Sequence, residues 1–413
     1  MKTYYDLVII GGGAAGLGAA ITAKQNGIDS ILLLEKNDKL GGILNQCIHA
    51  GFGLNEFKEE LTGPEYAARF IDEFNELKIE SLVNTMVTKV NKDKTIEFSN
   101  REGAYKVKFK ALILATGCYE RNAGAIKLAG DRCIGIFTAG QAQNYLNNNG
   151  YLPGKEVFIL GSGDIGLIMA RRLTLEGAHV IGVAEIMPYS NGLNRNVVQC
   201  LNDYNIPLYL STTVSKVKGE KRLEEITLSK VDDKLQPIPG TERVVKCDTL
   251  LLSIGLIPNV TLLNNLDTKY TKTSKIDVFN NLESNVEGVF ACGNCLHVHD
   301  LVDNVTEESR TAGLAAANYI LGKEKDGKVV NVNYSRDFLY VLPEKIKLNS
   351  DTCELKFRPR NHLKSPKVIV KQGDKVILKR VLPYLLPSEM EIIKLPLKDV
   401  DGDINMEIQL WQN

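Results

Sequence analysis

Two short glycine-rich segments of this chain have the residue types and the spacing to bind a phosphate-containing ligand. Gly11 to Gly16 and Gly161 to Gly166 each follow an apolar run and precede a stretch rich in Ala and Leu. Glycine lets the backbone turn tightly and approach a pyrophosphate, whose charge is met by N–H groups at a helix start. In both copies an acid, Glu35 or Glu185, follows the first glycine by 24 residues and is placed to hold ribose hydroxyls.

The repeated pattern of strand, glycine turn, helix, strand and acid predicts two dinucleotide-binding sites. The alternative is a pair of tight turns that connect buried strands to helices and bind nothing, which two matching copies argue against. An acid at the second site favours NAD over NADP, because it would repel a 2′-phosphate unless a neighbouring Lys or Arg offset its charge. The candidate residues in the two turns are Gly11, Gly13, Ala15 and Gly16, and then Gly161, Gly163, Asp164, Ile165 and Gly166.

Composition argues against several other classes of protein. Fifty Lys and Arg residues balance fifty Asp and Glu residues, so nothing favours nucleic acid or an anionic membrane as a partner. No apolar run reaches the roughly 18 residues of a membrane-spanning helix, and the N-terminus lacks the pattern of a signal peptide. The eight cysteines are scattered along the chain, which is typical of reduced thiols. We therefore expect a cytoplasmic protein without a membrane span.

Apolar segments predict the order of the domains. A buried strand at Ala111–Ala115 closes the first nucleotide-binding unit, and the pattern starts again near Cys118. Another strand, Gly288–Asn294, and an Ala-rich helix, Glu307–Leu321, follow the second unit, so the second unit is inserted into the first. Alternating segments beyond residue 328 predict strands. The predicted fold class is α/β, with two Rossmann-like domains, at 1–117 plus 247–322 and at 118–246, and a small C-terminal all-β domain at 330–413.

Four segments, in this order, resemble the flavoproteins with two dinucleotide-binding domains, the superfamily of glutathione reductase and thioredoxin reductase. They are Gly11–Gly16, Ala115–Gly117, Gly161–Gly166 and Val289–Asn294. Within that superfamily, Gly135–Gln143 looks like the subunits of amino-acid, opine and hydrogen-cyanide-forming dehydrogenases. Leu40–His49, His297–Asn304 and the β-rich tail are similar to a bacterial FAD/NAD(P)-binding protein that is encoded beside an FAD-dependent glycerol-3-phosphate dehydrogenase.

The resemblance implies that the first site binds FAD and the second binds NAD(P)H. The residues that it implies for FAD are Gly11, Gly13, Ala15, Gly16, Glu35, Lys36, Gly42, Thr116, Gly117, Gly293, Asn294, Leu301 and Val302. Those that it implies for NAD are Gly161, Gly163, Asp164, Ile165, Gly166, Glu185 and Gly255. Asn294 stands where the superfamily has an acid that holds the ribityl chain. An amide still makes hydrogen bonds but brings no charge.

The cysteines differ from those of a disulfide reductase of this superfamily. Neither a CxxxxC pair after the Gly41-Gly42 turn nor a CxxC pair in the second domain is present, which leaves Cys47 alone. A single thiol near a flavin reduces oxygen or peroxide in NADH oxidases and peroxidases, through a sulfenic acid. A buried, inert cysteine is the alternative for Cys47. Cys292 and Cys295 have CxxC spacing, but they overlap the predicted ribityl turn, so we expect packing rather than redox chemistry.

Histidines offer a weaker signal. His49, His297 and His299 raise the question of a metal, especially in the HxHD run that ends at Asp300. A metal site needs ligands that converge from several segments, so we favour a role beside the flavin or in capping the next helix, and we predict no metal.

These observations predict an FAD-dependent NAD(P)H oxidoreductase that transfers hydride between NADH and FAD. Hydride transfer needs no general base, which agrees with the lack of an acid/base or nucleophile constellation. The resemblance implies that electrons pass to or from a partner flavoprotein such as glycerol-3-phosphate dehydrogenase. A stand-alone NADH oxidase or peroxidase that uses Cys47, and a non-catalytic FAD-binding assembly subunit, are the alternatives. The tail domain is either the docking surface or a stabilising or homodimerising domain.

Overall fold

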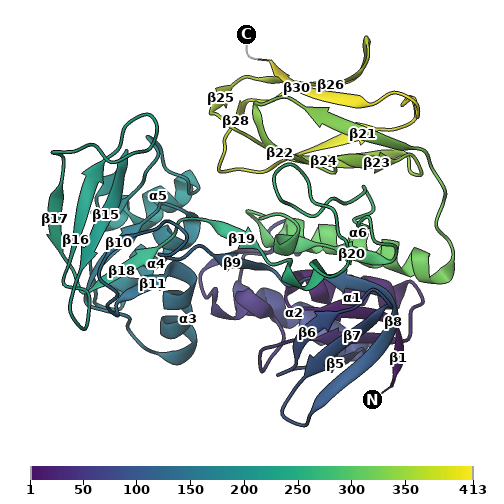
Figure 1. Cartoon of the computed structure of the whole chain (residues 1–413), viewed down its shortest axis with the longest axis horizontal. Coiled ribbons are helices and arrows are strands. Elements are labelled where there is room, and N and C mark those ends of the chain that lie inside the picture. The colour runs from purple at the N-terminus through teal and green to yellow at the C-terminus, as the bar shows by residue number, and fades with distance from the viewer. Residues whose placement is uncertain (1, 412–413) are drawn as a thin grey trace. The chain divides into compact units, whose positions relative to one another are not determined.

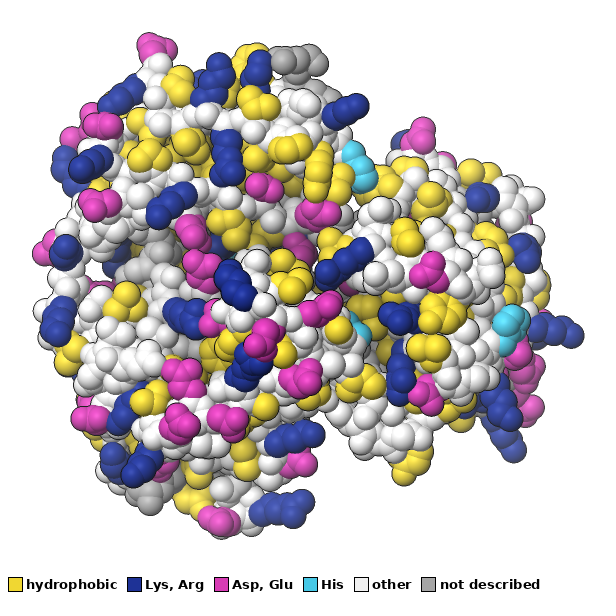
Figure 2. Space-filling view, turned by 180° about the vertical axis from the view of Figure 1, so that it is seen from behind, with side chains coloured by type: hydrophobic (Ala, Val, Ile, Leu, Met, Phe, Trp, Pro, Cys, Tyr) yellow, Lys and Arg dark blue, Asp and Glu magenta, His cyan; other side chains and the backbone are white. Residues whose placement is uncertain are grey.

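The computed structural model describes residues 2–411, which cluster by contacts into two compact units. The first unit comprises Met1–Asn45, Ala50–Cys118 and Pro258–Asn413, and the second comprises Gln46–His49 and Tyr119–Ile257. No helix among the described residues is long and apolar enough to cross a membrane. Figure 2 shows basic and acidic side chains mixed over one face of the molecule, as the balanced composition predicts.

The first unit is built on a sheet with the strand order β5-β2-β1-β8-β7-β6, to which β20 adds beside β8 (Figure 1). Its strands β1, β2, β5, β8 and β20 are parallel, and β6 and β7 join antiparallel. The strand bounds are β1 Tyr4–Ile10, β2 Ile31–Leu34, β5 Glu80–Leu82, β6 Met86–Val90, β7 Thr95–Ser99, β8 Ala104–Leu114 and β20 Val289–Ala291. Strand β2 and the C-terminal halves of β1 and β8 are apolar and buried, as is typical of parallel strands inside a sheet.

Three helices belong to this sheet: α1 Ala14–Gln25, α2 Gly63–Glu76 and α6 Val302–Leu321. Helix α2 begins after Thr62, which forms a capping box with Glu65, and Pro64 lies in its first turn. Helices α1 and α6 approach closely through glycines. A Cβ on Gly18 would lie 2.2 Å from the Ser309 hydroxyl, and one on Gly313 would lie 2.4 Å from a backbone oxygen of α1.

The second unit repeats this architecture in a parallel sheet of order β11-β18-β12-β13-β14. Its elements are β11 Ile136–Thr138, α3 Ala139–Asn149, β12 Glu156–Leu160, α4 Asp164–Leu175, β13 His179–Ala184, α5 Asn194–Cys200, β14 Leu208–Tyr209 and β18 Thr249–Leu252. A smaller sheet of order β10-β15-β16-β17 comprises Ala129–Gly130, Thr212–Lys218, Glu225–Lys230 and Arg243–Lys246. The confirmed fold class is therefore α/β with two Rossmann-like sheets.

The two main sheets correspond strand for strand, but the chain enters them differently. The order β5-β2-β1-β8-β20 matches β14-β13-β12-β18-β11. In the first unit the fifth strand and its helix, β20 and α6, come last in sequence, whereas in the second unit β11 and α3 come first. The boundary predicted at 246/247 is wrong, because β18 pairs with β12 inside the second sheet and the chain returns only at 257/258. An all-apolar strand does not reveal which sheet it joins.

The C-terminal strands have a hydrophobic core of their own and group with the first unit. One sheet has the order β23-β21-β30-β26-β27 and another the order β22-β24-β29. Their bounds are β21 Val329–Tyr334, β22 Phe338–Leu342, β23 Lys345–Lys347, β24 Thr352–Pro359, β26 Lys367–Gln372, β27 Lys375–Val381, β29 Glu391–Pro396 and β30 Met406–Trp411. The remaining short strands are β3 Ala50–Phe52, β4 Leu61–Thr62, β9 Cys118–Glu120, β19 Leu256–Pro258, β25 Leu363–Lys364 and β28 Tyr384–Leu385.

Candidate cofactor sites

The first glycine turn connects β1 to α1 and depends on glycine for two close backbone contacts. Gly11 has φ +109°, and a Cβ there would lie 2.3 Å from the carbonyl oxygen of Ala115 at the end of β8. A Cβ on Gly16 would lie 1.8 Å from the carbonyl oxygen of Gly11. Both glycines are therefore required by the fold itself.

Gly13 differs from these two glycines, because the fold does not require it. Its φ of −81° is accessible to any residue, and the nearest atom to an added Cβ is 3.8 Å away, on Gly42. Gly13 is the N-cap of α1, which has no side-chain cap and no acid in its first turn, so its first N–H groups can receive an anion. Since neither backbone conformation nor packing requires glycine at this position, a ligand that approaches the backbone closely would explain it, and a pyrophosphate is such a ligand.

Glu35 follows β2 and points at the glycine turn. Its carboxylate accepts hydrogen bonds from the N–H of Gly12 at 2.7 Å and from the N–H of Asn37 at 2.8 Å, and the residue is 5% exposed. Lys36 beside it is exposed. The acid therefore lies next to the turn where a ribose bound above β2 would need it.

Other candidate FAD residues lie against the same turn. A Cβ on Gly42, which has φ +57°, would lie 2.9 Å from the Cα of Gly13. A Cβ on Gly293, which has φ +73°, would lie 2.8 Å from the Cβ of Ala15. Three segments that are far apart in sequence thus meet at the start of α1.

The Thr116-Gly117 pair follows β8 and contacts Asn259. Thr116 donates its hydroxyl to the carbonyl of Asn259 at 2.6 Å, and Gly117 has φ +67°. These contacts hold the end of β8, and nothing in them assigns a ligand.

Asn294 uses its side chain within its own loop. Its Oδ1 accepts the backbone N–H of His299 at 3.0 Å and lies 3.3 Å from Nδ1 of that ring. Its Nδ2 lies 3.9 Å from the sulfur of Cys118. The amide therefore holds the turn from Gly293 to His299. A carboxylate in its place could accept the His299 N–H but could not donate a hydrogen bond.

Helix α6 begins at Val302, with Leu301 as its N-cap, and so starts before the Glu307 predicted from the Ala-rich pattern. Sequence reasoning missed the role of Asp303 in the first turn. Its carboxylate accepts the N–H groups of Asn55 at 3.1 Å and of Glu56 at 2.8 Å, and so fixes the 53–56 loop to the start of α6. Asp300, which was an alternative helix cap, instead pairs with Arg358 and accepts the N–H of Met390.

The second glycine turn reproduces the first. Gly161 has φ +96°, and a Cβ there would lie 2.1 Å from the carbonyl oxygen of Ser253 at the end of β18. The contact is equivalent to that of Gly11 with Ala115. Added Cβ atoms on Gly163 and Gly166 would lie 3.0 Å and 2.6 Å from the Ser253 side chain.

Glu185 follows β13 as Glu35 follows β2. It accepts the N–H and the hydroxyl of Ser162 at 2.9 and 2.7 Å, and the N–H of Met187 at 2.9 Å. The two acids thus make the same contacts: each accepts the N–H of the second residue of its glycine motif and the N–H of the residue two positions after the acid.

Other NAD candidates have different surroundings. The carboxylate of Asp164 accepts the N–H of Leu193 at 2.8 Å and the amide of Asn196 at 2.6 Å, so the side chain serves the loop before α5. Asp164 and the half-buried Ile165 are the first two residues of α4, so it is their backbone N–H groups that lie at the helix start. Gly255 has φ +103° and accepts the N–H of Arg121.

Cys47 belongs to the second unit, and its thiol lies 3.9 Å from Oε1 of Gln143 on α3. Burial raises the pKa of Cys47 to about 12. A thiol with this pKa is protonated at neutral pH, whereas the thiolate is the reactive species. The local environment therefore counts against Cys47 as a nucleophile.

This pKa predicts a specific pH dependence of alkylation. Since the thiolate fraction rises about tenfold per pH unit below the pKa, Cys47 in the folded protein should react slowly with iodoacetamide at pH 7 to 9 and should keep accelerating beyond pH 10. Peptide mass spectrometry follows each cysteine separately, and Cys133 is an internal control because burial raises its pKa less. A rate for Cys47 that levels off near pH 8 would contradict this environment.

Cys292 and Cys295 are fully buried, and burial raises the pKa of both thiols, that of Cys295 to about 12. The Cys295 thiol donates to the carbonyls of Leu114 and Cys292, each at 3.1 Å. All eight cysteines lie within residues 2–411, and each is a thiol in this structure. The pair packs the end of β20 against β8.

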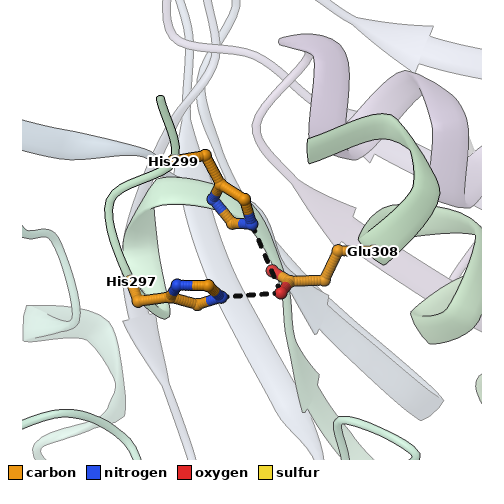
Figure 3. A group of neighbouring side chains, drawn as sticks. All are labelled: His297, His299 and Glu308. Atoms are coloured by element: carbon orange, nitrogen blue, oxygen red, sulfur yellow. Dashed lines mark hydrogen bonds and ion pairs between the residues drawn. The ribbon is translucent and has the colours of Figure 1, made fainter. Parts of the chain in front are cut away.

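His297 and His299 converge on the carboxylate of Glu308 in α6, as Figure 3 shows. Nε2 of His297 lies 2.7 Å and Nε2 of His299 lies 3.3 Å from Oε2 of Glu308. Three such ligands could hold a metal, but Lys356 places its ammonium 2.7 Å from the same oxygen. A positive charge already sits where a cation would bind, which favours an ion-pair network. His49 is outside this group and belongs to the second unit.

Residues 5–312 match the pyridine nucleotide-disulphide oxidoreductase family, and the chain belongs to that family. Its members use FAD and NAD(P)H as cofactors. The two glycine turns, each with its acid, are the places in this chain that fit these cofactors.

Two curated relatives illustrate the range of the family. Hydrogen cyanide synthase subunit HcnB of Pseudomonas aeruginosa is 25% identical over 289 residues, which are 64% of this chain and 59% of that protein. An NADH dehydrogenase of Ferdinandcohnia aciditolerans is 26% identical over 325 residues, which are 78% of this chain and 58% of that protein. The chain thus spans less than two thirds of the length of these relatives.

Solved structures share the fold. Thioredoxin reductase of T. acidophilum superposes with a TM-score of 0.62 at 22% identity, over 77% of this chain and 99% of that one. An NAD-dependent persulfide reductase of A. fulgidus gives a TM-score of 0.60 at 19% identity, over 89% of this chain and 67% of that one. At these identities the likeness concerns the fold alone.

Proposed function

We propose that this protein is an FAD-dependent NAD(P)H oxidoreductase that exchanges hydride between NADH and FAD and passes electrons to or from a partner flavoprotein. When bound, the two cofactors supply the redox chemistry, so the chain needs to bind and orient them rather than to provide a base. The observation that supports this proposal most is the equivalence of the two turns, each held by a buried acid after the neighbouring strand.

At each turn, different residues bind different parts of the cofactor. Gly13 and Gly163 let a pyrophosphate approach the backbone, and Glu35 and Glu185 accept hydrogen bonds from ribose hydroxyls. NADH is preferred to NADPH because Glu185 is 3% exposed and offers a negative charge where NADPH would bring a phosphate.

The state of the thiols argues against a disulfide as the electron acceptor of the flavin. Burial raises the pKa of Cys47, Cys292 and Cys295, so none of these thiols favours the thiolate that dithiol chemistry requires. We therefore propose that no redox-active disulfide operates in this chain and that a second flavoprotein, of the glycerol-3-phosphate dehydrogenase type, exchanges the electrons.

The C-terminal sheet offers a surface for that partner. Strand β27 is an edge strand, and Val381 and Trp411, each 57% exposed, are in register with Lys367 between them. Residues 360–385 contain seven Lys or Arg and one Asp. An exposed edge with apolar and basic side chains fits an acidic protein surface. A second copy of this chain is the alternative occupant.

We expect the double variant Lys379→Glu with Val381→Asp to slow electron transfer from the NADH-reduced protein to its partner by about tenfold at low salt. Both residues are on β27, on the same face of the sheet as Trp411 of β30, and both changes bring negative charge to that face. The partner flavoprotein is first isolated from the native host with the full chain as bait, and transfer is then followed by its absorbance.

Lys234→Glu, in an exposed turn of the second unit, is a charge-reversal control and should leave the rate unchanged. Equal rates for the double variant and the control would show that this surface is not the docking site. If no isolated flavoprotein accepts or donates electrons, the partner proposal itself is wrong.

A further inference from the structure

A side chain of the C-terminal sheets reaches a carboxylate that supports the Gly293 turn. Oε1 of Glu308 accepts the N–H of Gly293 at 2.8 Å, and Oε2 accepts Nζ of Lys356 on β24 at 2.7 Å. The Glu308 side chain is 1% exposed and that of Lys356 is 11% exposed. One buried carboxylate therefore connects the C-terminal sheets to the turn that packs against Ala15 at the start of α1.

Arg358 follows Lys356 by two residues on β24, so both side chains leave the same face of the strand. Arg358 pairs with Asp300 and donates to the carbonyl of Val298 at 3.3 Å. Tyr340 on β22 adds its hydroxyl 3.4 Å from Nδ1 of His297. Strands β22 and β24 thus contact His297, Val298 and Asp300 in the segment between Gly293 and the start of α6.

Lys356 forms the ion pair with the Glu308 carboxylate in this group. Burial lowers the pKa of His297 to about 3 against the pull of Glu308, so His297 is neutral near pH 7. Burial alone would raise the pKa of Glu308, but the Lys356 ammonium, with His297 and His299, holds it well below its ordinary value. Burial would lower the pKa of Lys356, but Glu308 raises it. Glu308 and Lys356 therefore form an ion pair, and the neighbouring His297 is neutral.

We propose that Lys356 is a positioning residue of the FAD site: by neutralising Glu308 it keeps that carboxylate on the Gly293 N–H, and so makes the C-terminal sheets a structural part of cofactor binding. The inference deepens the proposed function and rests on FAD binding at the first glycine turn. A buried carboxylate that loses its cation is strongly destabilised, and it regains balance by uptake of a proton, on the carboxylate itself or on His297 or His299 beside it, or by leaving the turn.

The test compares FAD affinity in four variants of the full chain. Lys356→Met keeps the length of the apolar stem and removes the charge, and it should weaken FAD binding at least about tenfold. Lys347→Met is the matched control, because Lys347 also joins the C-terminal sheets to the rest of the unit, through Glu283 at 2.7 Å, without touching the Gly293 turn. It should change FAD affinity by less than about twofold.

Glu308→Gln combined with Lys356→Met removes both charges and keeps an amide oxygen for the Gly293 N–H. We expect it to restore FAD affinity to within about threefold of the parent, a rescue that a loss of domain contacts alone would not give. Lys356→Arg keeps the charge and should bind FAD better than Lys356→Met. Flavin fluorescence titration measures the affinities, and thermal unfolding of the FAD-free variants shows which are folded.

Two results would overturn the inference: equal weakening by Lys356→Met and Lys347→Met, or no rescue by the double variant while it remains folded. If Lys356→Met does not fold, failure of the folded double variant to bind FAD decides against it. A parent protein that binds no FAD would instead sink the proposed function, so the two failures are distinguishable.

Discussion

Replacing Gly13 by Ala is expected to weaken FAD binding by at least about tenfold while the FAD-free protein stays folded. The FAD-free fold tolerates a methyl group there, since the backbone has φ −81° and the nearest atom is 3.8 Å from the added Cβ. A pyrophosphate at the start of α1 leaves no room for that methyl group. Thermal unfolding without FAD and a flavin fluorescence titration measure the two effects separately.

Gly11→Ala is the contrasting variant, because its Cβ would lie 2.3 Å from a carbonyl oxygen at φ +109°. It should lower the thermal stability of the FAD-free protein as well as FAD affinity. Unchanged FAD binding in Gly13→Ala would mean that the ligand does not approach the start of α1, and the first site would have to be sought elsewhere.

Glu35→Gln and Glu185→Gln are expected to separate the two cofactors. Loss of a carboxylate acceptor to a ribose costs roughly 1.5–3 kcal/mol, or about ten- to a hundredfold in affinity. Glu35→Gln should therefore lose FAD, and Glu185→Gln should keep FAD while its KM for NADH rises at least about tenfold. Each variant is the control for the other, because both acids are buried and hold their turns by the same contacts.

FAD content is read from the visible spectrum of the purified variants, and the KM from NADH oxidation with an artificial electron acceptor. Glu185→Gln should also narrow the preference for NADH over NADPH, since the charge that opposes the 2′-phosphate is gone. A loss of FAD in both variants, or in neither, would contradict the assignment of one cofactor to each turn.

The parts of the fold that sequence predicts well are those with local causes. The turns at Gly11 and Gly161 follow from glycine spacing, an apolar strand before them and a helix rich in Ala and Leu after them. Which sheet β18 joins could not be predicted in the same way. Its residues are apolar on both faces, and only the pairing with β12 decides that Thr249–Leu252 belongs to the second unit.

The candidate sites show the same division. Gly42 and Gly293 could be named from their motifs, and the structure brings both to the turn that contains Gly13. Asp303 and Lys356 could not, because each acts on a partner far away in sequence: Asp303 on the N–H groups of the 53–56 loop, and Lys356 on Glu308. A lone Asp in a helix and a lone Lys in a strand have no spacing that reveals such contacts.

Anaerobic titration of the purified, FAD-loaded protein with NADH tests the central claim most directly. The proposed hydride transfer predicts that about one equivalent of NADH bleaches the visible absorbance of the flavin, and that NADPH does so less effectively. A yellow protein whose flavin absorbance does not change with excess NADH would contradict the claim and would leave an FAD-binding assembly subunit as the better description.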